Sequence, residues 1–132
     1  MEINNEIKIR VRYGETDQMG VVYHGNYPQY MEVGRIEWLR SLGISYKKME
    51  ESGIMLPVIS LNINYKLSAK YDELLKVKTI LTKLPLAKIE FDYEIYNEND
   101  KIIAIGNTVL AFINKQTGKP TRCPDYILKK LV

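Results

Sequence analysis

One short stretch near the N-terminus, residues 13–27, concentrates side chains that can carry out acid–base chemistry. It holds the carboxylate of Asp17, the only histidine of the chain, His24, and the phenol of Tyr13, with glycines between them. A carboxylate beside a carbonyl group can act as a general base or as a nucleophile. Backbone N–H groups at the start of a helix lack intrahelical partners and can stabilise an oxyanion. These groups indicate acyl transfer, which requires neither a metal nor a cofactor.

The same residues also have structural interpretations. Asp17 can hydrogen-bond backbone N–H groups in an Asx turn. A single histidine is more often a structural residue than a catalyst, and Tyr13 ends a predicted strand, where aromatic residues are common. Glu32 and Arg35 are interpreted as an i, i+3 surface pair. Residue types and spacing alone leave the choice between the two interpretations open.

The elements on either side of this stretch would position it. Residues 7–13 alternate between apolar and basic side chains, which predicts a half-buried strand. Asn26 is predicted to be the N-cap of a long helix, with Gln29 as its capping-box partner, and Gly43 is predicted to end that helix. A short second helix is predicted over residues 45–52. The candidate carboxylate therefore lies in a loop just before a helix N-terminus.

After the helices the apolar period changes to two, which is typical of strands. Four further strands are predicted, over residues 59–66, 75–81, 88–95 and 102–113, and a short helix over residues 124–132. This order predicts a single α+β domain, residues 1–132, in which a five-stranded antiparallel sheet wraps around one long helix. One helix covers only one face of the sheet, and the strand 102–113 is apolar on both faces. We therefore predict a homodimer, and the same reasoning allows assembly to a tetramer.

Composition excludes several partners and sites. The formal net charge is +3, from 19 basic and 16 acidic residues that are scattered along the chain, so no nucleic-acid partner is expected. Cys123 is the only cysteine, which argues against a disulfide framework or a cysteine-based metal site, and it lacks an adjacent base, which predicts an inert thiol. No apolar run approaches the about 18 residues of a membrane span. Residues 1–6 are unlike a signal peptide, so a reducing cytoplasm is the expected compartment.

Two longer motifs resemble those of a known family. The first reads Tyr13-x-x-Thr16-Asp17-x-x-Gly20-Val21-Val22-Tyr23-His24-x-x-Tyr27 and continues to Glu32-x-x-Arg35-x-x-Trp38; the second is Asp72-Glu73-Leu74 before a predicted strand. Both resemble hotdog-fold acyl-CoA thioesterases of the hydroxybenzoyl-CoA thioesterase family. The branch of this family associated with the Tol–Pal system shares the pair Tyr23-His24, and this chain resembles that branch. The resemblance covers nearly the whole chain and implies a hotdog fold.

The resemblance also implies a function for individual residues. Asp17 would be the catalytic carboxylate, with Tyr13 and His24 as its companions, and a backbone N–H at or near His24 would be the oxyanion donor. The substrate would be an acyl-CoA, hydrolysed to free acid and coenzyme A without a further cofactor or metal. Whether Asp17 attacks the thioester itself or activates water stays open at this point.

Contacts with coenzyme A are less well defined by the motifs. Basic residues in loops are candidates for its phosphate groups: Lys66, Lys70 and Arg122. The segment 66–69 departs from the family pattern, because relatives often carry a proline in that loop.

Two other functions are compatible with such a fold. A hotdog dehydratase acting on hydroxyacyl thioesters needs a histidine and an acidic residue, but its His-Phe-Pro-Gly type of signature is absent and Gly25 follows His24. A non-catalytic acyl-binding subunit would have no need to retain Tyr13, Asp17 and His24 together. Thioester hydrolysis is therefore the preferred prediction.

Overall fold

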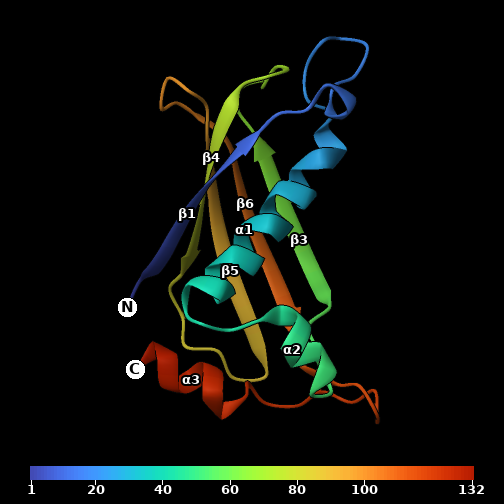
Figure 1. The fold of residues 1–132 in the computed structure, drawn as a ribbon, viewed down its shortest axis with the longest axis vertical. Coiled ribbons are helices and arrows are strands. Elements are labelled where there is room, and N and C mark those ends of the chain that lie inside the picture. The colour runs from blue at the N-terminus through green and yellow to red at the C-terminus, as the bar shows by residue number, and fades with distance from the viewer.

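The computed structural model describes residues 1–132, and its centre is a five-stranded antiparallel sheet under one long helix (Figure 1). In spatial order the strands are β1 (Ile3–Arg10), β4 (Leu74–Leu81), β5 (Lys88–Tyr96), β6 (Ile102–Ala111) and β3 (Val58–Tyr65). Helix α1, Tyr27–Ser41, crosses one face of this sheet. The predicted α+β architecture is confirmed.

The remaining elements are short. They are two 3₁₀ turns, η1 (Tyr13–Glu15) and η2 (His24–Asn26), the helices α2 (Tyr46–Glu51) and α3 (Asp125–Leu131), and the paired strands β2 (Ile54–Met55) and β7 (Ile113–Asn114). Both short helices lie where the sequence predicts helices. None of the helices combines the length and the apolar character that crossing a membrane requires.

The contact between α1 and the sheet depends on a glycine in the apolar stripe of the helix. A Cβ atom at Gly34 would lie 2.7 Å from Oγ1 of Thr79 on β4, so only glycine permits this approach. One helical turn further on, Trp38 is fully buried, packs edge-to-face on Phe91 with ring centroids 5.0 Å apart, and donates its Nε1–H to the carbonyl of Ile3 at 3.0 Å. These contacts fix α1 over β1 and β4.

The sequence prediction is correct for the C-terminal end of α1 and wrong for its N-terminal end. Gly43 follows the helix with φ +80°, as predicted for a C-terminal glycine. At the other end, Asn26 has helical backbone angles and makes no side-chain cap, because η2 leads directly into α1. Its side-chain amide instead donates to the carbonyl of Glu15 at 2.8 Å. The predicted capping box between Asn26 and Gln29 is therefore wrong.

The first strand begins and ends earlier than predicted. It spans Ile3–Arg10, not residues 7–13, because Ile3 continues the apolar alternation and pairs with Leu81. The chain then leaves the sheet at Val11, whose N–H donates to the carbonyl of Glu73 at 2.9 Å. Tyr13 consequently lies in the turn η1 and not at a strand end.

Strand β6 is an interior strand, flanked by β5 and β3, as its apolar residues predict. Burial on both faces is nevertheless confined to its two ends. Ile103 and Ala104 are both buried at a register shift, and Ala111 is buried next to Phe112. Between these ends the outer face is open, with Ile105 exposed. The apolar residues on both faces of β6 are thus explained by burial of its two ends within the chain. They give only weak support to the predicted dimer.

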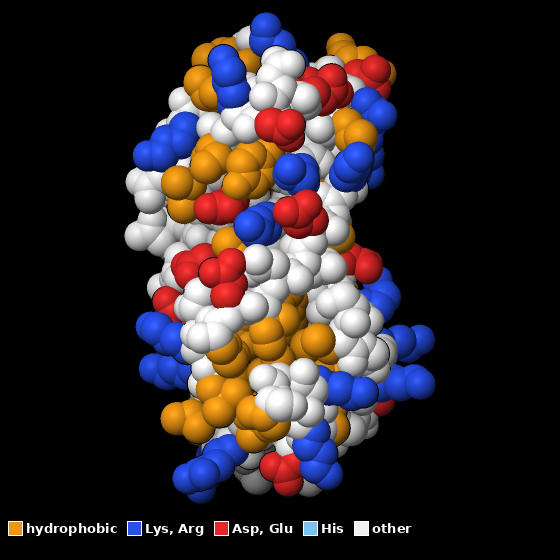
Figure 2. All heavy atoms as spheres, turned by 90° about the vertical axis from the view of Figure 1, so that its left-hand side faces the viewer, with side chains coloured by type: hydrophobic (Ala, Val, Ile, Leu, Met, Phe, Trp, Pro, Cys, Tyr) orange, Lys and Arg blue, Asp and Glu red, His pale blue; other side chains and the backbone are white.

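The two edges of the sheet have different surfaces. Along β1 every second residue faces solvent, and this face of the molecule mixes charges of both signs, with a hydrophobic area in its lower half (Figure 2). Along β3 almost every residue is exposed, including the apolar Ile59 (51%) and Leu61 (46%). An exposed apolar edge strand is prone to pair with another chain. This edge is a stronger reason to expect a dimer than β6 is.

Candidate active site

The loop between β1 and α1, residues 11–26, carries the candidate catalytic residues and lies at one end of the sheet (Figure 1). A second loop, residues 66–73, holds it in place from the side. The N–H of Val22 donates to the carbonyl of Ala69 at 2.8 Å, and the N–H of Asp72 donates to the carbonyl of Val11 at 3.1 Å. The two loops therefore form one hydrogen-bonded unit.

The two carboxylate oxygens of Asp17 differ in their hydrogen bonding. Its Oδ1 accepts a hydrogen bond from the N–H of Met19 at 2.9 Å, which is the Asx turn that the structural interpretation predicts. Gly20, with φ +80°, closes the turn by donating its N–H to the carbonyl of Asp17 at 3.0 Å. Oδ2 accepts no hydrogen bond within the chain. The turn thus orients the carboxylate and leaves one oxygen available for a ligand.

Asp17 and His24 line the same cleft, which has a volume of about 250 Å³. Its walls also include the apolar side chains of Met19, Val21 and Leu67. A cleft with a carboxylate and apolar walls suits a substrate that joins a reactive carbonyl to a hydrocarbon group.

Two backbone N–H groups at this cleft's helix terminus are without partners. His24 and Gly25 begin η2, and neither N–H donates to any group of the chain, whereas the N–H of Asn26 donates to the carbonyl of Tyr23 at 2.9 Å. A Cβ atom at position 25 would lie 2.6 Å from the ring of Tyr23, so a larger residue there requires that exposed ring to move. Free N–H groups at a helix start carry partial positive charge and can stabilise an oxyanion.

Glu15 anchors the loop from below and was not identified by the sequence analysis. Its side chain is buried (9% exposed for the residue), and the carboxylate accepts hydrogen bonds from the N–H of Arg12 at 2.8 Å and from the hydroxyl of Tyr30 at 3.0 Å. Its carbonyl accepts from the N–H of Tyr23 and from the side chain of Asn26. The only signal in the sequence is an acid three residues after the basic end of a strand.

The hydroxyl of Tyr30, which donates to Glu15, is buried. Burial, followed by the hydrogen bond to the Glu15 carboxylate, raises the pKa of Tyr30 well above its ordinary value. The phenol therefore stays protonated and donates to Glu15 throughout the neutral range. Glu15 is thereby committed to structure, whereas Asp17, two residues further on, is not.

Tyr13, predicted as a companion of Asp17, does not line the cleft. Its side chain is 77% exposed and packs edge-to-face on Tyr71, with ring centroids 5.5 Å apart. Its backbone stabilises the loop, because the carbonyl of Tyr13 accepts a hydrogen bond from the hydroxyl of Thr16 at 2.7 Å. Within one chain the structure brings together Asp17 and His24, and it leaves Tyr13 outside.

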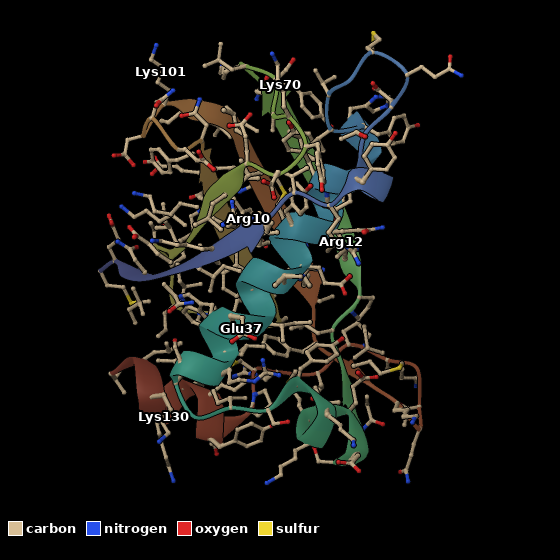
Figure 3. The ribbon with its side chains drawn as sticks, turned by 45° about the horizontal axis from the view of Figure 1, so that its top comes forward. Arg10, Arg12, Glu37, Lys70, Lys101 and Lys130 are labelled. Atoms are coloured by element: carbon tan, nitrogen blue, oxygen red, sulfur yellow. The ribbon has the colours of Figure 1, made fainter.

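The three basic candidates for coenzyme A lie at different places. Lys66 lines the cleft. Lys70 is exposed at the same end of the molecule as the cleft loop (Figure 3). Arg122 belongs to a segment tied to the opposite end of the sheet, where the N–H of Cys123 donates to the carbonyl of Leu86. Because β6 spans 10 residues, about 30 Å, Arg122 does not reach the cleft of its own chain.

Other predicted features are placed as follows. Glu32 and Arg35 do not form the predicted ion pair; instead both line a separate cavity of about 150 Å³ between α1, α2 and β5. The Arg35 guanidinium lies near the buried hydroxyl of Tyr93: burial raises the pKa of Tyr93, and the guanidinium lowers it in part. Burial also raises the pKa of the Cys123 thiol to about 12, in agreement with the predicted inert cysteine.

The fold, a five-stranded antiparallel sheet around one long helix, is that of a hotdog protein. The chain belongs to the thioesterase-like superfamily, whose family model matches residues 11–131. This confirms the resemblance found in the sequence motifs and the hotdog fold that it implied. Membership of the branch associated with the Tol–Pal system stays a prediction.

Individual relatives support the same placement. YneP of Bacillus subtilis, whose assignment as an acyl-CoA thioesterase is provisional, is 39% identical over 113 residues, which cover 86% of this chain and 82% of YneP. The acyl-CoA thioesterase YbgC of Haemophilus influenzae is 32% identical, over 90% of this chain and 88% of its own. The crystal structure of DHNA-CoA thioesterase from Staphylococcus aureus superposes with a TM-score of 0.87 at 44% identity, covering 90% and 80% of the two chains.

Proposed function

We propose that this protein hydrolyses an acyl-CoA thioester to a free acid and coenzyme A, with Asp17 as the catalytic carboxylate. The observation that carries this proposal is the position of Asp17, which has an oxygen free of hydrogen bonds and lines the same cleft as His24, at a helix start with unpaired N–H groups. Carboxylate and oxyanion donors are the two components that thioester hydrolysis requires. Family membership adds independent support.

Two sequences of steps fit this arrangement. As a general base, Asp17 takes a proton from a water molecule whose oxygen attacks the thioester carbonyl carbon. The oxyanion is held by the free N–H groups of His24 and Gly25, and collapse breaks the C–S bond and releases coenzyme A as a thiolate that takes up a proton. As a nucleophile, Asp17 displaces the thiolate to form an acyl anhydride, and water then cleaves it. Both need only residues of the chain and water.

Substrate contacts follow from the lining of the cleft. The apolar walls formed by Met19, Val21 and Leu67 would contact the acyl group. Lys66 at the cleft and Lys70 near it would contact phosphate groups of coenzyme A, whereas Arg122 could contribute only from another copy of the chain. Because a relative with 44% identity is named a DHNA-CoA thioesterase, aromatic acyl groups are the first class to test.

The decisive assay is release of free thiol from a panel of short, long and aromatic acyl-CoA substrates. We expect steady-state thiol release with at least one of them. Hydration of an enoyl-CoA without thiol release would instead indicate a hotdog dehydratase. Binding of acyl-CoA with neither reaction would indicate a non-catalytic acyl-binding subunit. Either of these results would refute the proposed function.

A further inference from the structure

Tyr65, the last residue of β3, contacts the cleft loop and takes no part in the reaction steps proposed above. Its hydroxyl donates a hydrogen bond to the carbonyl of His24 at 2.9 Å, and its side chain lines the cleft. This is the only side-chain hydrogen bond to the His24–Gly25 peptide. It joins the sheet to the start of the helix across 41 residues of sequence.

The same carbonyl accepts a second hydrogen bond, from the N–H of Tyr27. A peptide group whose oxygen accepts two hydrogen bonds is both fixed in orientation and more strongly polarised, because hydrogen bonds along a chain reinforce one another. The N–H on the other side of this peptide belongs to Gly25, which has no partner in the chain. The hydroxyl of Tyr65 therefore makes this free N–H a better and better-placed donor.

We propose that Tyr65 is a positioning residue for an oxyanion donor: its hydroxyl holds the His24–Gly25 peptide so that the free N–H of Gly25 faces the reacting carbonyl. The proposal rests on the proposed thioester hydrolysis. Tyr65 acts through the peptide and not on the substrate. Its loss therefore lowers the rate of the chemical step and leaves substrate binding almost unchanged.

A packing function for Tyr65 predicts a different outcome. Its ring lies edge-to-face against Tyr27, with centroids 5.1 Å apart, and against His24, at 6.2 Å. Tyr65→Phe keeps both ring contacts and removes only the hydroxyl. If packing is the whole function of Tyr65, this substitution changes neither turnover nor the backbone of the loop.

The kinetic test compares Tyr65→Phe with a matched substitution on the opposite face of the sheet. Tyr96→Phe removes a hydroxyl that donates to Glu94 at 2.7 Å, and Tyr96 does not line the cleft. We expect Tyr65→Phe to lower kcat about five- to tenfold, the effect of one neutral hydrogen bond, with KM within twofold of wild type. Tyr96→Phe should leave both constants unchanged. An unchanged kcat, or a raised KM with unchanged kcat, for Tyr65→Phe overturns the proposal.

A second measurement is independent of any catalysed reaction. In ¹H–¹⁵N spectra of the free protein, Tyr65→Phe should shift the Gly25 amide proton upfield, since its peptide loses a hydrogen bond at the carbonyl, whereas Tyr96→Phe should not. An unmoved Gly25 signal overturns the proposal even if the enzyme is active. If the Gly25 signal moves but wild type releases no thiol from any acyl-CoA, the proposed function has failed, and the positioning of this peptide stands.

Discussion

The two sides of the loop that precedes α1 contrast in how their polar groups are used. On the buried side, the Glu15 carboxylate is paired with Arg12 and Tyr30. On the cleft side, Asp17 keeps one free carboxylate oxygen and His24 a free N–H. Paired buried groups stabilise a structure, whereas unpaired groups at a cleft are able to bind a ligand. The contrast assigns stability to Glu15 and chemistry to Asp17, although both are acids two residues apart.

The largest expected effect is loss of hydrolysis in Asp17→Asn. Asparagine keeps the Oδ1 that accepts the N–H of Met19, so the turn and the melting temperature should be retained. An amide cannot act as a base or a competent nucleophile, and general-base catalysis contributes about 100- to 10,000-fold. We expect turnover of a preferred acyl-CoA to fall by at least about 100-fold, with ligand affinity maintained.

Asp72→Asn provides the matched control for this change. Asp72 is exposed in the adjacent loop and has φ +71°, a conformation that asparagine tolerates, so this variant should keep both turnover and stability. If Asp17→Asn retains more than about a tenth of wild-type turnover, below the general-base range, then Asp17 is a turn residue. The proposed catalytic site would then have to be abandoned.

The second effect concerns the exposed edge strand β3, whose last residue, Tyr65, lines the cleft. We expect no stable monomer of the wild type at micromolar concentration in sedimentation experiments, because the exposed edge strand carries apolar residues such as Ile59 and Leu61. Leu61→Glu should produce monomers and reduce thiol release. Lys8→Glu, on the opposite edge strand, is the control and should leave the oligomer intact. A folded and active wild-type monomer would rule out an active site that depends on two copies.

A smaller effect is expected on the buried side of the loop, in Glu15→Gln. Oε1 of Glu15 accepts from both the N–H of Arg12 and the hydroxyl of Tyr30, and glutamine can keep this oxygen but without its negative charge. Oε2, which accepts from the Arg12 guanidinium at 3.3 Å, would be replaced by an NH2 group that cannot accept. A hydrogen bond to a charged group contributes about 1.5–3 kcal/mol, so the melting temperature should fall by several degrees, at about 4 °C per kcal/mol. Turnover measured well below the new melting temperature should change less than in Asp17→Asn. An unchanged melting temperature would show that Glu15 is not the anchor of the loop.

The sequence predicted those features that depend on local chemistry. Glycines at the ends of helices, such as Gly43, and the alternation of the strands follow from neighbouring residues alone. Glu15 and Tyr65 were missed because their partners lie 15 and 41 residues away, and no short motif reports such contacts. The capping box failed for a related reason, since the Asn26 side chain binds a carbonyl 11 residues earlier. Asp17 was found through its family motif, because an Asx turn and a catalytic base have the same local sequence.

The smallest effect is expected from removal of the His24 ring. If the N–H of His24 matters more than its imidazole, His24→Ala should lower turnover by less than about tenfold, well below the general-base range. His24→Pro then isolates the N–H: position 24 is the first of η2 and Tyr23 before it is extended, with ψ 132°, which is where proline is tolerated. Loss of one oxyanion donor costs about 100- to 1,000-fold, so the proline variant should be much the slower of the two. Circular dichroism and melting temperatures establish that both variants are folded. Equal losses in His24→Ala and Asp17→Asn would instead make the imidazole a participant in the reaction.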